Sequence, residues 1–281
     1  MAILMPGGPV GKALSEKTAQ NAARLRELGV TATLEVIRVG QRPEDMAYER
    51  AAMKRAQAVG VQVRQTLLPA DARPEELVAA LERVNRDDSV HGCLLFRPLP
   101  EQLSAPGLTE TLCPEKDVDG MTPGSLAGLL TGRGGFAPCT AQACLELLDY
   151  YGVDPVGRRA VVIGRSLVVG QPAALLLQRR NATVTVCHTG TRDIPALCRE
   201  ADVLIAAAGR PGLITADCLR PGQTVLDVGV HPGPDGTLCG DVAPEAAGLD
   251  LALTPVPGGV GSVTSAVLCK HTIQAAENTR L

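Results

Sequence analysis

The chain has 281 residues, enough for two domains, and its 45% hydrophobic and 20% charged residues are ordinary for a folded globular protein. Its net charge of -3 gives no basic footprint for nucleic acid, and 3 Tyr, 2 Phe and no Trp leave few rings on which bases could stack. No apolar run reaches the roughly 18 residues that span a membrane. Neither nucleic acid nor a membrane is therefore an expected partner.

The nine cysteines point to a reducing compartment. Their number is odd, none form a C-x-x-C pair, and no histidine stands at zinc-ligand spacing beside them. The N-terminal stretch is broken early by Pro and Gly, unlike a secretory signal peptide. We expect free thiols, no metal site and a cytoplasmic location.

The first half of the chain alternates helices and strands. Apolar spacing and glycine or proline stops predict helices at 13–28, 43–59 and 73–84, and strands at 31–39, 61–68 and 90–96. Strands that alternate with helices in this way form a parallel sheet covered by helices. We therefore expect an α/β domain here.

The alternation starts again after a stretch rich in Gly and Pro, 128–140, which is a predicted linker. Further strands are predicted at 159–164, 182–188, 202–209 and 223–229, and helices at 143–152, 168–180 and 262–281. The expected fold class is α/β, with two α/β domains that contain parallel-rich sheets.

The stretch "VVIGRSLVVGQP", 161–172, indicates a nucleotide site. An apolar strand runs into Gly164, a short loop follows, and a helix begins near Gly170. Glycines at such a turn let a phosphate approach the backbone, and the helix N-terminus offers free N–H groups. The two glycines are six residues apart, so the usual G-x-G-x-x-G spacing is not present.

The end of the next strand bears on which cofactor binds. An NAD site usually carries an acidic residue there, which binds the ribose hydroxyls, but this chain has His188 and Thr189. Arg165 lies in the first loop and could bind the additional phosphate of NADP. Val230 follows another predicted strand, at the edge of the sheet where ligands bind. We expect NADP as the cofactor.

Several motifs together resemble one family. They are "YERAAMK" (48–54), "RPLP" (97–100), "PEKDVDGMTPGSLAGL" (114–129), "PCT" (138–140), the stretch 161–172, "ATVTVCHTGT" (182–191) and "TPVPGGVGSVT" (254–264). The chain resembles the methylenetetrahydrofolate dehydrogenase/methenyltetrahydrofolate cyclohydrolase family over nearly its whole length, with the motifs in the right order.

The resemblance implies a homodimer of two-domain subunits with a cleft between the domains. A catalytic domain at 1–138 would be completed by the C-terminal helix 263–281, and a Rossmann-like NADP-binding domain would occupy 139–262. The implied cofactor-binding residues are Gly164, Arg165, Ser166, Gly170, His188, Thr189 and Val230. The implied folate-binding residues are Tyr48, Ala52, Phe96, Asp119, Pro257, Gly258, Gly259, Val260 and Gly261, with Tyr48 and Asp119 as the catalytic pair.

The chemistry of these residues suits a folate. A carboxylate such as Asp119 can accept two N–H donors from the edge of a pterin. Tyr48 can stack on the ring while its hydroxyl stays polar. The loop 257–261 has small residues after its proline, so its backbone can approach a ring closely. A turn that ends at Gly120 would also explain Asp117 and Asp119.

Three positions depart from the family's pattern. Bifunctional members carry a lysine four residues after the tyrosine and a glutamine before the Pro-Leu-Pro segment, whereas this chain has Ala52 and Phe96. Ser262 also stands where a proline is usual. Lys54 lies about 120° around the helix from Tyr48, which favours a solvent-exposed lysine. Arg55 returns to the face of Tyr48 but stays protonated, so it cannot act as a base.

The sequence therefore predicts an NADP-dependent methylenetetrahydrofolate dehydrogenase with weak or absent cyclohydrolase activity. Hydride transfer needs two oriented rings more than a base, whereas hydrolysis needs proton transfer. One alternative is the full bifunctional enzyme, with Arg55, Arg97 or water replacing the lysine. Others are a non-catalytic folate- or nucleotide-binding protein and a dehydrogenase for another class of small molecule.

Overall fold

The structure, a computed structural model, describes residues 1–105, 107–233 and 236–279 and divides the chain into two compact units. The six-stranded unit contains Met1–Gly11 and Thr140–Thr264, and the three-stranded unit contains Lys12–Cys139 and Ser265–Leu281. The sequence placed the first eleven residues in the first domain. They lie with the other unit because the short strand β1 (Ile3–Leu4) pairs in parallel with β11 (Ala252–Leu253).

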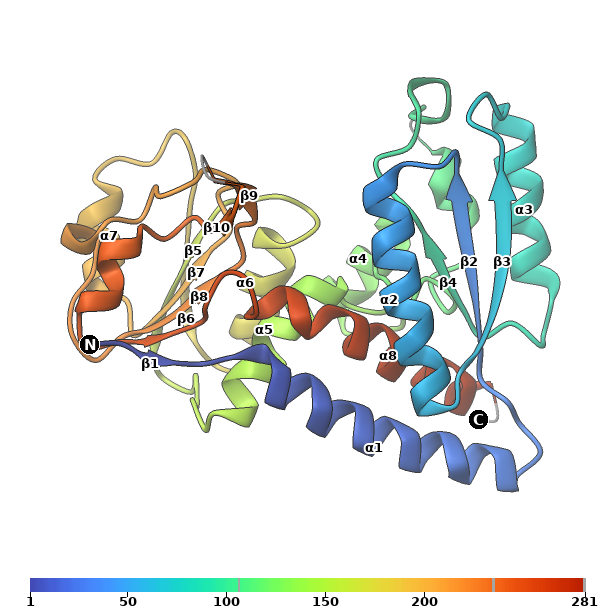
Figure 1. Ribbon diagram of the computed structural model, residues 1–281, viewed down its shortest axis with the longest axis horizontal. Coiled ribbons are helices and arrows are strands. Elements are labelled where there is room, and N and C mark those ends of the chain that lie inside the picture. Colours follow the sequence, from blue (N-terminus) through green and yellow to red (C-terminus); the bar gives the residue numbers. More distant parts are fainter. Residues whose placement is uncertain (106, 234–235, 280–281) are drawn as a thin grey trace. The chain divides into compact units, whose positions relative to one another are not determined.

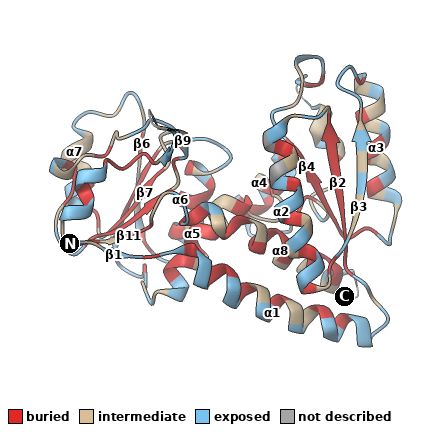
Figure 2. Cartoon of the chain, viewed as in Figure 1, coloured by how far each residue is buried: buried red, intermediate tan, exposed pale blue. Residues whose placement is uncertain are grey.

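The three-stranded unit has the predicted β-α-β-α-β order (Figure 1). Its strands β2 (Thr33–Val39), β3 (Gln62–Leu68) and β4 (Gly92–Leu95) are parallel in the order β3-β2-β4. Helices α2 (Pro43–Val59) and α3 (Pro74–Arg86) connect them, and α3 packs its apolar face on the sheet. The central strand β2 is buried throughout, whereas the edge strand β3 is partly exposed (Figure 2).

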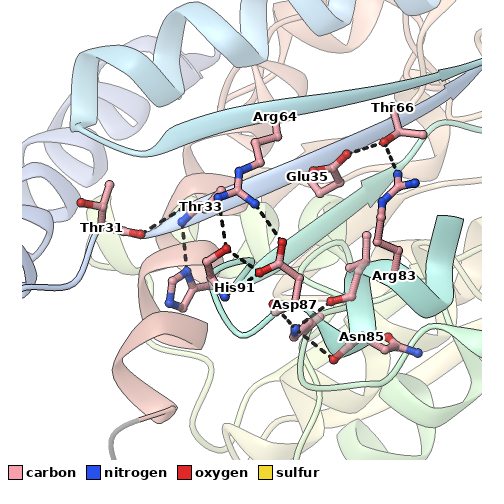
Figure 3. Close-up of polar contacts among 12 residues, drawn as sticks. Thr31, Thr33, Glu35, Arg64, Thr66, Arg83, Asn85, Asp87 and His91 are labelled. Carbon is pink, nitrogen blue, oxygen red and sulfur yellow. Dashed lines mark hydrogen bonds and ion pairs between the residues drawn. The ribbon is translucent and has the colours of Figure 1, made fainter.

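Polar side chains join α3 and its following loop to this sheet (Figure 3). Arg64 on β3 donates to Asp87 at 2.9 Å. Thr66 donates to the buried Glu35 at 2.5 Å and accepts from Arg83 at 2.7 Å. A buried carboxylate without such a partner would be costly, so these bonds stabilise the packing of α3 on the sheet.

The six-stranded unit is a parallel sheet in the order β1-β11-β8-β7-β5-β6. Its longer strands are β5 (Arg159–Ile163), β6 (Thr183–Cys187), β7 (Val203–Ala206) and β8 (Thr224–Asp227). Its helices are α5 (Cys139–Tyr150), α6 (Gly170–Arg179) and α7 (Ile194–Glu200). A small antiparallel pair, β9 (His231–Pro232) and β10 (Leu238–Cys239), follows β8. The apolar strands β7 and β8 are fully buried, as expected of central parallel strands.

Three helices differ from the prediction. Helix α4 (Pro123–Thr131) occupies the start of the predicted linker, because the Thr122 side chain caps its N-terminus and Gly132 ends it with φ 78°. Helix α1 (Gly7–Glu27) begins six residues earlier than predicted, and α7 was not predicted. Helix α8 (Thr264–Asn278) confirms the C-terminal helix.

All nine cysteines have free thiols, in agreement with the prediction. Within the described ranges, His, Cys, Asp and Glu side chains form no group of three or more that could hold a metal ion. Across the same ranges, every helix is too short or too polar to cross a membrane.

Candidate active site

The first pocket lies at the carboxyl ends of β5, β6 and β7 and has a volume of about 330 Å³. It brings together five of the seven predicted cofactor residues: Gly164, Arg165, Ser166, His188 and Thr189. In open parallel sheets, ligands bind at this edge. The geometry of the first pocket therefore matches a nucleotide site.

Glycines shape the first pocket. Gly164 has φ 117°, which side-chain-bearing residues rarely adopt, and a Cβ there would overlap the carbonyl of Ala207. A Cβ at Gly170 would overlap the carbonyl of Gly164, so Gly170 lets α6 pack closely against the strand rather than lining the pocket. Ser166 Oγ accepts from the N–H groups of Val169 at 3.2 Å and Gly170 at 3.4 Å. The serine thereby orders the turn where α6 begins.

Three basic side chains line the first pocket. Arg165 and Arg210 are exposed, and His188 is half-buried. The Nδ1 of His188 accepts from the N–H of Gly190 at 3.1 Å, which leaves Nε2 to carry the proton of the neutral ring. Sequence reasoning missed Arg210, whose one signal is that it follows the predicted strand 202–209. Together these side chains suit an anionic phosphate.

Two buried aspartates hold the loops at this edge, and the sequence analysis missed both. Asp241 accepts from the N–H groups of residues 208–210 at 2.6 to 3.0 Å. Asp227 accepts from the N–H groups of Gly229 at 3.0 Å and of Asp241 and Val242 at 2.9 Å. Burial raises the pKa of Asp227, while these N–H groups lower it. The carboxylates thus fix the backbone beside the first pocket.

A second pocket, of about 230 Å³, follows the ends of β8 and β11. Residues 255–262 line one part of it and residues 227–230 another, so it contains the whole predicted folate loop 257–261. Val230, predicted to bind the cofactor, also lines it and is 57% exposed. Because β8 neighbours β7, the two pockets follow one another along the same edge of the sheet.

The other predicted folate residues lie in the three-stranded unit. The ring of Tyr48, on α2, meets that of Phe96 edge to face, with centroids 5.9 Å apart and planes at 77°. Phe96 directly follows β4 and is 8% exposed, whereas Tyr48 is 38% exposed. Ala52, one turn after Tyr48, is buried. The structure therefore places these three residues near the ends of β2 and β4.

Of the two cations near Ala52, one is exposed to solvent and the other binds side chains of neighbouring helices. Lys54 is exposed, as predicted for a solvated lysine. The guanidinium of Arg55 donates to Ser15 on α1 and to Ser265 on α8, both at 2.9 Å. Arg55 thus joins three helices.

Asp117 and Asp119 have different roles. The carboxylate of Asp117 accepts from the N–H groups of Met121 at 3.1 Å and Thr122 at 2.7 Å, so Asp117 is a turn residue. Asp119 is half-buried. Burial raises the pKa of Asp119 to about 7, and the charge of Asp117 adds to the rise, while Cys139 and Arg97 lower it. Asp119 can therefore change protonation near neutral pH.

The raised pKa of Asp119 predicts a pH-dependent stability. The folded state binds the proton of the Asp119 carboxyl group more tightly than the unfolded chain does. The stabilising contribution of this proton to the free energy of unfolding is therefore fully present below the ordinary pKa of 3.8 and is lost as the pH rises through about 7. Asp119→Asn should therefore melt at a higher temperature than the wild type at pH 8 and at a similar temperature at pH 4. Thermal melts across this range test the prediction, and a constant difference between the proteins would contradict it.

Family models match both halves of the chain. Residues 5–119 match the catalytic domain of the tetrahydrofolate dehydrogenase/cyclohydrolase family, and residues 138–280 match its NAD(P)-binding domain. The second match covers the first pocket, the second pocket and both buried aspartates.

Known relatives are similar to this chain in sequence and in structure over almost its whole length. The bifunctional protein FolD of Carboxydothermus hydrogenoformans is 44% identical over 99% of this chain and 98% of its own. The crystal structure of the bifunctional FolD enzyme from Campylobacter jejuni has a TM-score of 0.95 and 36% identity, with both chains fully covered. A Trypanosoma brucei relative, solved with NADP and an inhibitor, has a TM-score of 0.91 and 35% identity over 99% of this chain and 98% of its own. The chain belongs to the tetrahydrofolate dehydrogenase/cyclohydrolase family.

Proposed function

We propose that this chain oxidises 5,10-methylenetetrahydrofolate to 5,10-methenyltetrahydrofolate with NADP. The main support for the proposal is the pair of pockets at one edge of the six-stranded sheet. They occur in a chain of which both halves match models of the tetrahydrofolate dehydrogenase/cyclohydrolase family. When bound, NADP accepts a hydride from the one-carbon bridge of the folate, which leaves a methenyl cation and NADPH.

The first pocket fits the phosphate-bearing part of NADP. The bare backbone at Gly164 admits a phosphate closely, because a side chain there would overlap Ala207. Arg165 and Arg210 supply positive charge at the strand ends, and His188 supplies a donor. The second pocket lies next along the edge, so Val230 would receive the nicotinamide end of the cofactor, and the loop 257–261, which lines the same pocket, would bind the folate.

Tyr48, Phe96 and Asp119 would hold the folate. The exposed ring of Tyr48 offers a stacking surface, and Phe96 supports it from the side. An ionised Asp119 accepts the N–H donors of the pterin edge, so the pKa near 7 sets the pH above which this contact forms. Orientation of two rings is what hydride transfer requires of a protein.

Hydrolysis of the methenyl product is the second activity of the proposed function. The bacterial relatives are named bifunctional, which favours the full bifunctional enzyme over the sequence-based expectation of weak hydrolysis. The narrower candidate is a dehydrogenase with weak hydrolysis, and it is favoured by the side chains at the positions where bifunctional members carry lysine and glutamine. Ala52 and Phe96 carry no proton-transfer group, Lys54 points to solvent and Arg55 is bound to two serines.

Separate assays of the two steps test the proposal. NADPH formation from methylenetetrahydrofolate measures the oxidation, and the decay of added methenyltetrahydrofolate measures the hydrolysis. We expect rapid NADPH formation that depends on both substrates. Enzyme-dependent decay at a rate close to that of oxidation would establish the bifunctional enzyme, and decay at the rate of buffer alone would establish the narrower candidate. Absence of NADPH formation would refute the proposed function.

Restoring the two polar residues gives a further prediction. In the double variant Ala52→Lys and Phe96→Gln, hydrolysis should rise at least about tenfold, since a positioned proton-transfer group contributes a large rate factor. Lys54→Ala is the matched control and should leave both rates unchanged. Unchanged hydrolysis in the double variant would show that other groups of this chain already transfer the proton.

A further inference from the structure

The carbonyl oxygen of Val118, in the peptide bond that precedes Asp119, receives two side-chain donors. The Nδ1 of His271, on α8, lies 2.9 Å from this oxygen, and the Sγ of Cys139, at the start of α5, lies 3.4 Å away. A carbonyl oxygen can only accept, so Nδ1 of His271 must carry a proton. Two elements distant in the sequence thus fix one peptide group beside a proposed substrate-binding carboxylate.

The two donors are buried and tightly packed. His271 is 4% exposed and Cys139 is 3% exposed, and Sγ lies 3.9 Å from Nδ1. The ring of Phe136 lies against the imidazole, with centroids 5.0 Å apart and planes at 33°. Buried in this way, the imidazole has one well-defined position from which to donate.

The other side of the turn is equally constrained. Gly120 has φ 65°, and a Cβ there would overlap the backbone of residues 136–138. The Asp117 carboxylate holds the N–H groups of residues 121–122. The peptide between Val118 and Asp119 is therefore held from both sides, and the donors on its carbonyl determine its rotation.

We propose that His271 is a positioning residue, whose Nδ1–H orients the Val118–Asp119 peptide so that the Asp119 carboxylate faces the folate. The inference rests on the proposed function for the contact between Asp119 and the substrate. A thiol is a weak donor, so Cys139 alone does not hold the carbonyl as firmly as an imidazole N–H. The charged groups that act on Asp119 itself are Asp117 and Arg97.

Two amide substitutions separate the role of Nδ1 from that of ring volume. His271→Asn places its amide nitrogen where Nδ1 lies and keeps the bond to Val118, whereas His271→Gln places it near Nε2 and removes that bond. The pKa of Asp119 can be read without substrate by NMR titration of labelled aspartate carboxyl carbons, with Asp119→Asn identifying the signal. The KM for methylenetetrahydrofolate and the Kd for NADP complete the set.

In His271→Gln, a released Asp119 turns toward water, so its pKa should fall by at least one pH unit and the KM for the folate should rise about tenfold. His271→Asn should leave the pKa of Asp119 close to its wild-type value and the KM for the folate within about twofold of the wild type. The Kd for NADP should not change in either variant. Equal behaviour of the two variants, or an unchanged pKa in His271→Gln, would overturn the proposal.

Two results keep the test decisive. If His271→Gln does not fold, Cys139→Ala, which removes the weaker donor to Val118, should raise the KM for the folate by a smaller factor, and an unchanged KM would overturn the proposal; the pKa of Asp119 is not compared in this variant, because the Cys139 thiol itself lowers it. A wild type without hydride transfer, combined with the expected pKa change in His271→Gln, would refute the proposed function while supporting the positioning of Asp119.

Discussion

Replacing Asp119 by asparagine is expected to lower kcat/KM for methylenetetrahydrofolate about a hundredfold, because two charge-assisted hydrogen bonds to the pterin are lost or weakened. The wild-type kcat/KM should fall as the pH drops below about 7, where Asp119 becomes protonated, and this acid limb should vanish in the variant. Steady-state kinetics from pH 5 to 9 measure both effects.

Glu115→Gln is the matched control for Asp119→Asn. Glu115 is an exposed carboxylate of the same turn region and should have no effect on either substrate. The Kd for NADP should also stay constant in Asp119→Asn, because the first pocket belongs to the other unit. A variant that retains the wild-type kcat/KM and the same acid limb would show that Asp119 does not contact the folate.

Arg165→Gln is expected to raise the KM for NADP by about tenfold or more, while the KM for NAD changes less than about twofold. The reason is that the guanidinium, on the loop after β5, would contact the phosphate that distinguishes the two cofactors. The preference of the wild type for NADP should then largely disappear. Initial rates with each cofactor at saturating folate provide the measurement.

Arg192→Gln is the control for charge alone, since Arg192 is exposed on the loop after β6 and does not line the first pocket. It should leave both KM values near those of the wild type. An equal rise of KM for NADP and NAD in Arg165→Gln would mean that the arginine binds a part shared by both cofactors.

Much of the fold could be predicted because its signals are local. Helix α2 has its predicted bounds, since Pro43 starts it and Gly60, with φ 82°, ends it. The features that were missed depend on contacts between distant segments. Strand β1 has two residues and forms only by pairing with β11, and α4 was hidden in a stretch whose glycines pack against backbone.

In the candidate site too, residues with a local sequence signal could be predicted, whereas residues that depend on contacts between distant segments could not. Gly164 and Arg165 could be predicted because a strand, a loop and a helix follow one another directly in the sequence. Asp227 and Asp241 form one network, but 14 positions separate them, and their partners are backbone N–H groups that no motif reveals. His271 is 153 positions from Val118, so its contact depends on the tertiary fold of the three-stranded unit.

The most direct test of the proposed function is the initial rate of NADPH formation by the purified protein with methylenetetrahydrofolate. The account predicts turnover that requires the folate, is faster with NADP than with NAD, and is reduced about a hundredfold in Asp119→Asn. An absence of folate-dependent NADPH formation at saturating concentrations of both substrates would contradict it.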